Sequence, residues 1–132
     1  MTHKVVINKS NKFFPIKGLN ELLAGRIYDY RTKKYRNPVK SENDKVCCRC
    51  INRDLKDLKL KTPIRCTYNI FVPDKRHDRG NIYAAVEKSF LDAMQTCNVI
   101  VNDGFSSVLD SVFYTEVDNV NPRVEVIIEE VE

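Results

Sequence analysis

The stretch PDKRHDRGN, residues 73–81, places carboxylates and cations side by side. Two more aspartates follow along the chain, Asp92 and, in the sequence VNDG, Asp103. Carboxylates are ligands that Mg²⁺ accepts, and lysine or arginine side chains bind phosphate oxygens. These residue types therefore suit a site in which acids hold a divalent ion beside a phosphate group. A solvated turn with ordinary surface charges is the structural alternative.

Each of these residues also has a common structural role. Asp78 precedes a predicted helix, and a helix N-terminus stabilises a carboxylate. Lys88 and Asp92 have the i,i+4 spacing of an ion pair on a helix surface. Asn102, Asp103 and Gly104 are typical of a turn. Only the combination of these residues indicates a specific chemistry.

The elements predicted to position them form an α+β, or mixed α/β, fold. Apolar alternation and β-branched residues predict strands over residues 4–8, 62–72, 108–117 and 122–131. Apolar periodicity and capping residues predict helices over 19–25, about 39–57 and 81–97. The order β-α-α-β-α-β-β predicts a single domain, residues 1–132, with helices packed on a small four-stranded sheet.

The third helix carries the clearest periodicity. Apolar residues from Ile82 to Cys97 recur at i, i+3, i+4 and i+7, and Asn81 is the predicted N-cap. A strand is expected to end at Val72, so Asp78 follows the carboxyl end of that strand. Sheets of this class tend to place their sites at such ends.

Positive charge is concentrated in the first half of the chain. Residues 1–65 hold 17 Lys and Arg against 6 Asp and Glu, whereas residues 66–132 hold 5 against 12. This asymmetry suits a polyanionic partner for the first half. The two halves could equally neutralise each other within the fold or across a dimer.

The segment RIYDYRTKKYR, residues 26–36, interleaves tyrosines with cations. Aromatic faces between cations suit stacking on bases and contact with phosphates. A solvated loop whose tyrosines pack on one another is the more common structure for such a segment. The candidate phosphate contacts of the whole chain are Lys12, Lys17, Arg31, Lys33, Lys34, Arg36, Lys75, Arg76 and Arg79.

Cysteine usage and hydropathy bound the remaining possibilities. Five cysteines without regular spacing favour buried thiols in a reducing compartment, and neither disulfides nor a zinc site is expected. No apolar run approaches the ~20 residues that span a bilayer, so no membrane partner is expected. The N-terminal sequence MTHKVVINKS has no apolar signal segment. A cytoplasmic location is therefore predicted.

The motifs of the second half together resemble the RusA family of Holliday-junction resolvases. The similarity runs over residues 66–131, from VPDKRHDRGNIYAAVEKSFLDAM through VIVNDGF to NPRVEVIIEE. Asp78 and Asn81 fall on the first aspartate and the asparagine of the family's Asp-x-Asp-Asn motif. Asp92 falls on an Asp-Ala-Leu-like triplet, and Asp103 falls on the last catalytic aspartate.

The chain departs from that family pattern at two positions. Gly80 stands where the family has its second aspartate, and Ala84 stands where it has its lysine. By resemblance, Asp78 and Asp103 are the predicted catalytic residues and hold the metal with Asp92, and either Asp92 or Asp74 compensates for the carboxylate missing at Gly80. Lys88 replaces the missing lysine in this prediction.

The resemblance implies an endodeoxyribonuclease that resolves four-way junctions by paired symmetric nicks, in DNA recombination and repair. The implied cofactor is Mg²⁺, with Mn²⁺ as an alternative, and the implied partners are branched DNA and a second copy of the chain. Its predicted DNA contacts are Lys33, Lys34, Arg36, Lys75, Arg76 and Arg79, and Asn81 supports the site. The missing carboxylate at Gly80 leaves open a protein that binds branched DNA without cutting it. The tyrosine-rich segment leaves open a binder of single-stranded nucleic acid.

Helix length restricts how the predicted site is assembled. A helix of ~16 residues is about 25 Å long, so Asp78 and Asp103 start at opposite ends of it. Either residues 98–103 run back in an extended conformation, or a second subunit supplies Asp103. A two-fold symmetric dimer matches the symmetry of a four-way junction and provides two equivalent sites.

Overall fold

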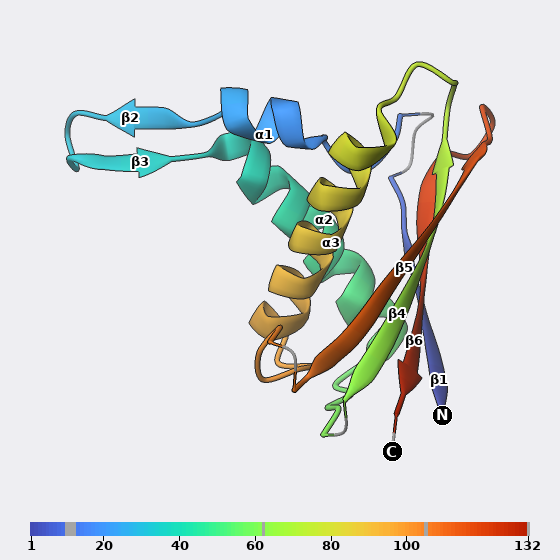
Figure 1. The fold of residues 1–132 in the computed structure, drawn as a ribbon. Helices are drawn as coiled ribbons and strands as arrows, with labels where there is room; N and C mark the ends of the chain where they lie inside the picture. The colour runs from blue at the N-terminus through green and yellow to red at the C-terminus, as the bar shows by residue number, and fades with distance from the viewer. Residues whose placement is uncertain (10–12, 62, 105, 132) are drawn as a thin grey trace.

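The computed structural model describes residues 1–9, 13–61, 63–104 and 106–131, and it consists of a sheet with helices on one face (Figure 1). The predicted α+β class with a four-stranded sheet is confirmed, and a two-stranded sheet is present in addition. The elements are β1 (Thr2–Ile7), α1 (Leu19–Ala24), β2 (Ile27–Asp29), β3 (Lys34–Arg36), α2 (Pro38–Leu55), β4 (Ile64–Val72), α3 (Arg79–Thr96), β5 (Val108–Val117) and β6 (Arg123–Glu130).

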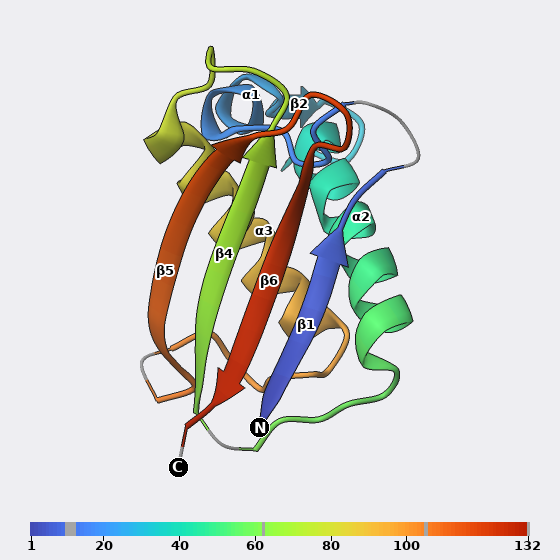
Figure 2. The ribbon, with the colours of Figure 1, turned by 90° about the vertical axis from the view of Figure 1, so that its right-hand side faces the viewer.

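The four-stranded sheet has the order β1-β6-β4-β5 (Figure 2). β4 and β5 are parallel, and α3 is the crossover between them, as a parallel connection requires. β6 pairs antiparallel with both β1 and β4, so β1 and β5 form the edges of the sheet. This topology places the N-terminus of α3 beside the carboxyl ends of β4 and β5.

The core lies between the sheet and the helices α2 and α3. Every second residue of β4 is buried, as its alternation predicts, and Tyr68 at the centre is fully inaccessible. Phe90 of α3 packs edge-on against Tyr68, with ring centroids 5.8 Å apart. Cys47 and Cys50 of α2 are fully buried, which confirms the prediction of buried thiols on a helix.

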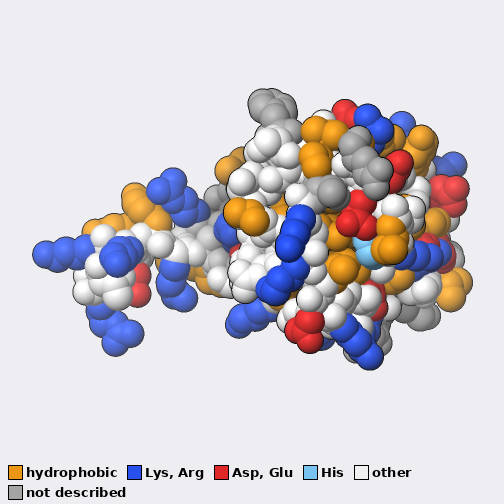
Figure 3. Space-filling view, turned by 90° about the horizontal axis from the view of Figure 1, so that it is seen from below, with side chains coloured by type: hydrophobic (Ala, Val, Ile, Leu, Met, Phe, Trp, Pro, Cys, Tyr) orange, Lys and Arg blue, Asp and Glu red, His pale blue; other side chains and the backbone are white. Residues whose placement is uncertain are grey.

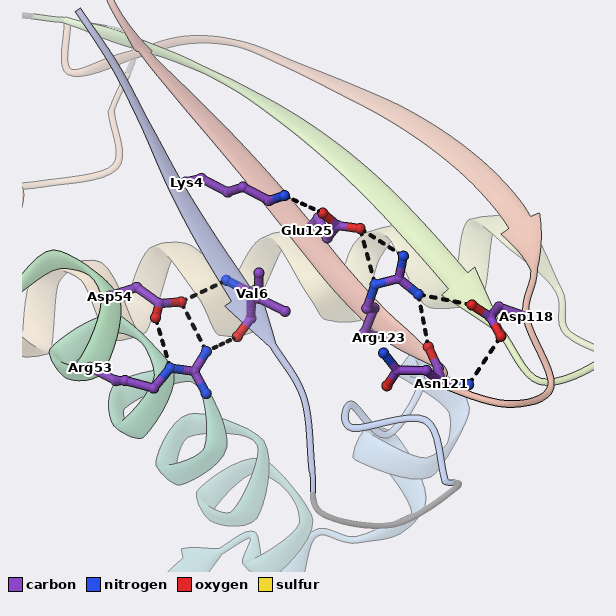
Figure 4. Close-up of polar contacts among 8 residues, drawn as sticks. All are labelled: Lys4, Val6, Arg53, Asp54, Asp118, Asn121, Arg123 and Glu125. Atoms are coloured by element: carbon purple, nitrogen blue, oxygen red, sulfur yellow. Dashed lines mark hydrogen bonds and ion pairs between the residues drawn. The ribbon is translucent and has the colours of Figure 1, made fainter.

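The face of the sheet away from the helices carries paired charges (Figure 4). Arg123 donates to Asp118 and Glu125, and its guanidinium lies 3.9 Å from the centroid of the Phe71 ring. Lys4 of the edge strand β1 forms an ion pair with Glu125. These contacts tie the β5–β6 turn and the edge strand to the middle of the sheet.

The start of α3 differs from the prediction. The N-cap is Asp78, whose Oδ1 accepts a hydrogen bond from the backbone N of Asn81 at 3.0 Å, so the helix begins at Arg79. The prediction of Asn81 as the cap was wrong because aspartate and asparagine cap helices about equally well. The side chain of Asn81 instead accepts a hydrogen bond from the backbone N of Asn20, at the start of α1.

The segment 26–36, called the arm below, also differs from the expected loop. It forms the β2–β3 hairpin, which projects away from the rest of the chain (Figure 1). Tyr28 lies opposite Tyr35 in its register, and Lys33 takes the left-handed conformation (φ 57°) in its turn. The tyrosines do pack on one another, as the loop interpretation expected.

Within the described residues, none of the helices combines the length and the apolar character needed to cross a bilayer.

Candidate nucleic-acid interface and carboxylate sites

The arm carries a net charge equal to that of the whole chain. It contains five cations (Arg26, Arg31, Lys33, Lys34 and Arg36) and one carboxylate (Asp29), which gives +4. The other 121 residues hold 17 Lys and Arg and 17 Asp and Glu, so their formal charges cancel. Figure 3 shows these cations along the projection at the left of the molecule. Outside the arm, the first half (residues 1–25 and 37–65) still carries +7 and the second half (residues 66–132) carries −7, so these two parts neutralise each other and the arm accounts for the net charge.

The arm cations are available to a partner. In the described part of the chain, none of them forms an ion pair with a carboxylate. Arg26 instead lies over the Tyr35 ring, 3.9 Å from its centroid. The predicted contacts Lys33, Lys34 and Arg36 thus lie together on one projecting element, whereas Lys12 lies outside the described residues.

Two asparagines hold α1, the helix that leads into the arm. Asn37 donates from Nδ2 to the carbonyl of Leu22 at 2.7 Å, and its Oδ1 caps α2 through the backbone N of Lys40. Asn81 holds α1 against α3, and a Cβ at Gly18 would clash with the side-chain Nδ2 of Asn81. Glycine is therefore needed at position 18 for this close approach. Through these contacts, α1 connects the arm to the N-terminus of α3.

Asp78 lies at the N-terminal end of α3, the end that Asn81 links to α1. Beside it is a cavity of about 370 Å³ between α3 and β5, lined by Val72, Asp74, Lys75, His77, Arg79, Ile82, Thr115, Glu116 and Val117. Hydrogen bonds from Arg76 hold the pKa of Asp74 below its usual value. Asp74 also lies 3.6 Å from His77. Of the three predicted DNA contacts in this loop, Lys75 and Arg79 line the cavity, and Arg76 is engaged with Asp74.

Asp92 lies between two lysines. Its carboxylate is 3.1 Å from Lys88 Nζ and 3.5 Å from Lys40 Nζ. Hydrogen bonding to Asp44, ahead of the charges of Asp44 and Asp92, raises the pKa of Lys40. The positive charges beside Asp92 oppose the binding of a cation there. Lys88 forms with Asp92 the i,i+4 ion pair that is the structural alternative to its predicted catalytic role.

Asp103 lines a different cavity, of about 440 Å³, again between α3 and β5. The other lining residues are Glu87, Leu91, Gly104, Val108, Leu109, Asp110, Ser111 and Phe113. Three carboxylates thus line this cavity, and that of Asp110 is paired with Arg65 at 2.8 Å. Sequence reasoning missed Glu87 and Asp110. Glu87 lies one helical turn before Leu91 and therefore shares a face of α3 with it. No sequence motif, however, distinguishes Glu87 or Asp110 from ordinary surface acids.

One chain does not bring the predicted metal ligands together. The Asp103 cavity meets α3 at Glu87 and Leu91, which lie about 14 and 20 Å along the helix axis from Asp78. Asp92 is held by its lysines. Among the residues described, no three His, Cys, Asp or Glu side chains are grouped as a metal site would require. The residues of a single chain therefore do not fit a Mg²⁺ ion through Asp78, Asp92 and Asp103.

Comparison of the sequence with models of known protein families and with curated proteins finds no match. The RusA resemblance therefore rests on the residues quoted above and stays a prediction.

Proposed function

We propose that this chain binds branched DNA and cuts it with Mg²⁺ as a homodimer whose two active sites are shared between copies. The arm is the observation that carries the proposal. Its five cations and three tyrosines project into solvent from a body whose charges cancel. A polyanion with exposed bases is the partner that matches both residue types.

The flank between α3 and β5 supports the dimer. Both cavities open along it, with Asp103 at one end and Asp78 at the other. A two-fold axis across the middle of this flank would set the Asp103 end of one copy against the Asp78 end of the other. The contact would cover two exposed apolar side chains of the edge strand β5, Leu109 and Val117, each of which lines one of the cavities.

The two ends differ in charge. The Asp103 end holds Glu87 and Asp110 in addition, whereas the cavity at the Asp78 end combines the carboxylates of Asp74 and Glu116 with the cations Lys75 and Arg79. Such an arrangement would also supply carboxylates from a second copy in place of the one that Gly80 lacks. When bound, Mg²⁺ would polarise the scissile phosphate and lower the pKa of a bound water.

Mixing two inactive variants tests the shared site. Asp78→Asn keeps the N-cap, because asparagine caps equally well, and Asp103→Asn removes the other carboxylate. Each variant alone should leave a four-way junction uncut in the presence of Mg²⁺. A mixture of the two should regain activity, since random pairing restores roughly a quarter of the sites. Each mixed dimer has one intact site, so the products should be singly nicked junctions on a denaturing gel.

The controls separate the alternatives. Asp57→Asn, an exposed aspartate outside both cavities, should cut like the wild type. Junction cleavage by the wild type without recovery in the mixture would place the site within one subunit. A gel shift of the junction without any cleavage would identify a DNA-binding protein that does not cut. The carboxylate missing at Gly80 favours that second candidate.

A further inference from the structure

The three tyrosines of the arm differ in exposure. Tyr28 is 36% exposed and Tyr35 is 61% exposed, whereas Tyr30 is 85% exposed. Tyr28 contacts both other rings edge-on, with centroids 4.8 Å from Tyr30 and 5.0 Å from Tyr35. Arg26 covers a face of Tyr35. Tyr28 and Tyr35 therefore hold the hairpin together, which leaves Tyr30 for another role.

Tyr30 sits at the tip on an ordered turn. The side chain of Asp29 accepts a hydrogen bond from the backbone N of Arg31 at 2.9 Å and so closes the turn around it. Within the described residues, the perpendicular contact with Tyr28 is its one ring contact. A flat face of Tyr30 is thus presented to solvent, with Arg31 and Lys33 on the same turn. Pre-ordering of such a ring lowers the entropic cost of binding.

We infer that Tyr30 is a stacking platform for an unpaired or unstacked base, and that it makes the arm prefer a DNA branch point over a continuous duplex. This inference rests on the proposed function and names the feature of the DNA that the arm recognises. The neighbouring cations bind phosphates, which duplex and branched DNA both offer. Only an interrupted helix exposes the face of a base, and a tyrosine ring stacks on any base without sequence preference. The phosphate contacts and the stacking contact therefore contribute separately to binding.

Binding without a divalent ion tests this separation. Affinities for a four-way junction and for a duplex of matched sequence are measured by fluorescence anisotropy in EDTA. Tyr30→Leu should weaken junction binding by about 5- to 100-fold and leave duplex binding within twofold. Tyr30→Phe, which keeps the ring, should retain the wild-type preference. Arg31→Gln, the matched change of an adjacent cation, should weaken the junction and duplex complexes equally. It should also make the slope of log affinity against log salt concentration shallower by about one.

A tryptophan reports the stacking directly. The chain contains no tryptophan, so Tyr30→Trp introduces a single fluorophore at the tip. Its emission should be quenched by the junction and by single-stranded DNA more than by duplex. Leu23→Trp is the control, because Leu23 is 69% exposed but lies on α1, off the arm tip. Its emission should not discriminate between the DNAs. Because residue 30 is exposed, unfolding curves of its variants should match the wild type.

Several results would overturn the inference. Equal loss of junction and duplex binding in Tyr30→Leu would make the ring a general contact, and an unchanged preference would leave it without a role. Stronger quenching by single-stranded RNA than by the junction would overturn the assignment to branched DNA. In each case junction cleavage by the wild type in Mg²⁺ would leave the proposed function standing. A wild type that neither binds nor cuts branched DNA would overturn both.

Discussion

The arm and the body of this molecule use charged residues in opposite ways. In the body, many cations are engaged with nearby carboxylates, as Arg123 is with Asp118 and Glu125. In the arm, five cations accompany one carboxylate, and no ion pair forms among the described residues. The formal charges of the body thus sum to zero, whereas the charge of the arm is left for a partner. Net charge alone, a mild +4, hides this difference.

The same contrast holds for aromatic rings. Tyr68 and Phe90 are fully buried and contribute to the stability of the fold. The tyrosines of the arm contact mainly one another and solvent. A two-stranded hairpin is marginal on its own, so the arm depends on its cross-strand pair and on the contacts of Asn37 at its base. Changes in the arm should therefore alter binding, and changes in the body should alter folding.

The largest predicted difference is in stability. Phe90→Ala removes a fully buried ring and should lower the free energy of unfolding by about 3–5 kcal/mol, measured by urea denaturation. Tyr35→Ala removes an exposed ring of a cross-strand pair and should cost at most about 1 kcal/mol. Equal costs would show that the arm is part of the cooperative core.

The second prediction concerns the salt dependence of DNA binding. Changing Arg31, Lys33 and Lys34 to glutamine should make the slope of log affinity against log salt shallower by about 3, because three phosphate contacts are lost. The matched control changes three exposed lysines of the body, Lys45, Lys59 and Lys61, and removes the same charge. That control should keep the wild-type slope. Equal effects of the two triple variants would mean that net charge, and not the arm, drives binding.

The smallest predicted effect concerns pH. Hydrogen bonding from Arg53, together with the backbone N of Val6, holds the pKa of Asp54 below its ordinary 3.8 (Figure 4). A carboxylate with a lowered pKa in the folded state stabilises that state above 3.8, and this contribution is lost as the pH falls through the folded pKa. Asp54→Asn should therefore cost about 1 kcal/mol or less at neutral pH, and the difference should disappear in acid.

Urea denaturation at several pH values measures this effect. Asp29→Asn is the control in the arm, and it should leave the free energy of unfolding unchanged at each pH. A cost for Asp54→Asn that is the same at pH 3 and pH 7 would contradict an ionic contribution.

Periodicity predicted most of the body. The strand at 108–117 has the predicted bounds, and the other strands and both long helices agree to within two residues at each end. The predicted cap was wrong because Asp78 and Asn81 are chemically similar and only the backbone conformation distinguishes them. The hairpin was missed because residues 26–36 lack the apolar alternation of a half-buried strand. Its pairs are held by the tyrosines and by the contacts at its base.

The sequence by itself determined the α+β class, the buried faces of β4 and α3, and the gathering of cations and tyrosines in residues 26–36. These properties depend on local periodicity and composition, which are complete in a single strand or helix. Only the tertiary structure decided that the arm projects, that Asp92 lies between two lysines, and that Asp103 lines a cavity away from Asp78. Those outcomes depend on how elements far apart in the chain pack together, and the contacts that fix them have no local signature.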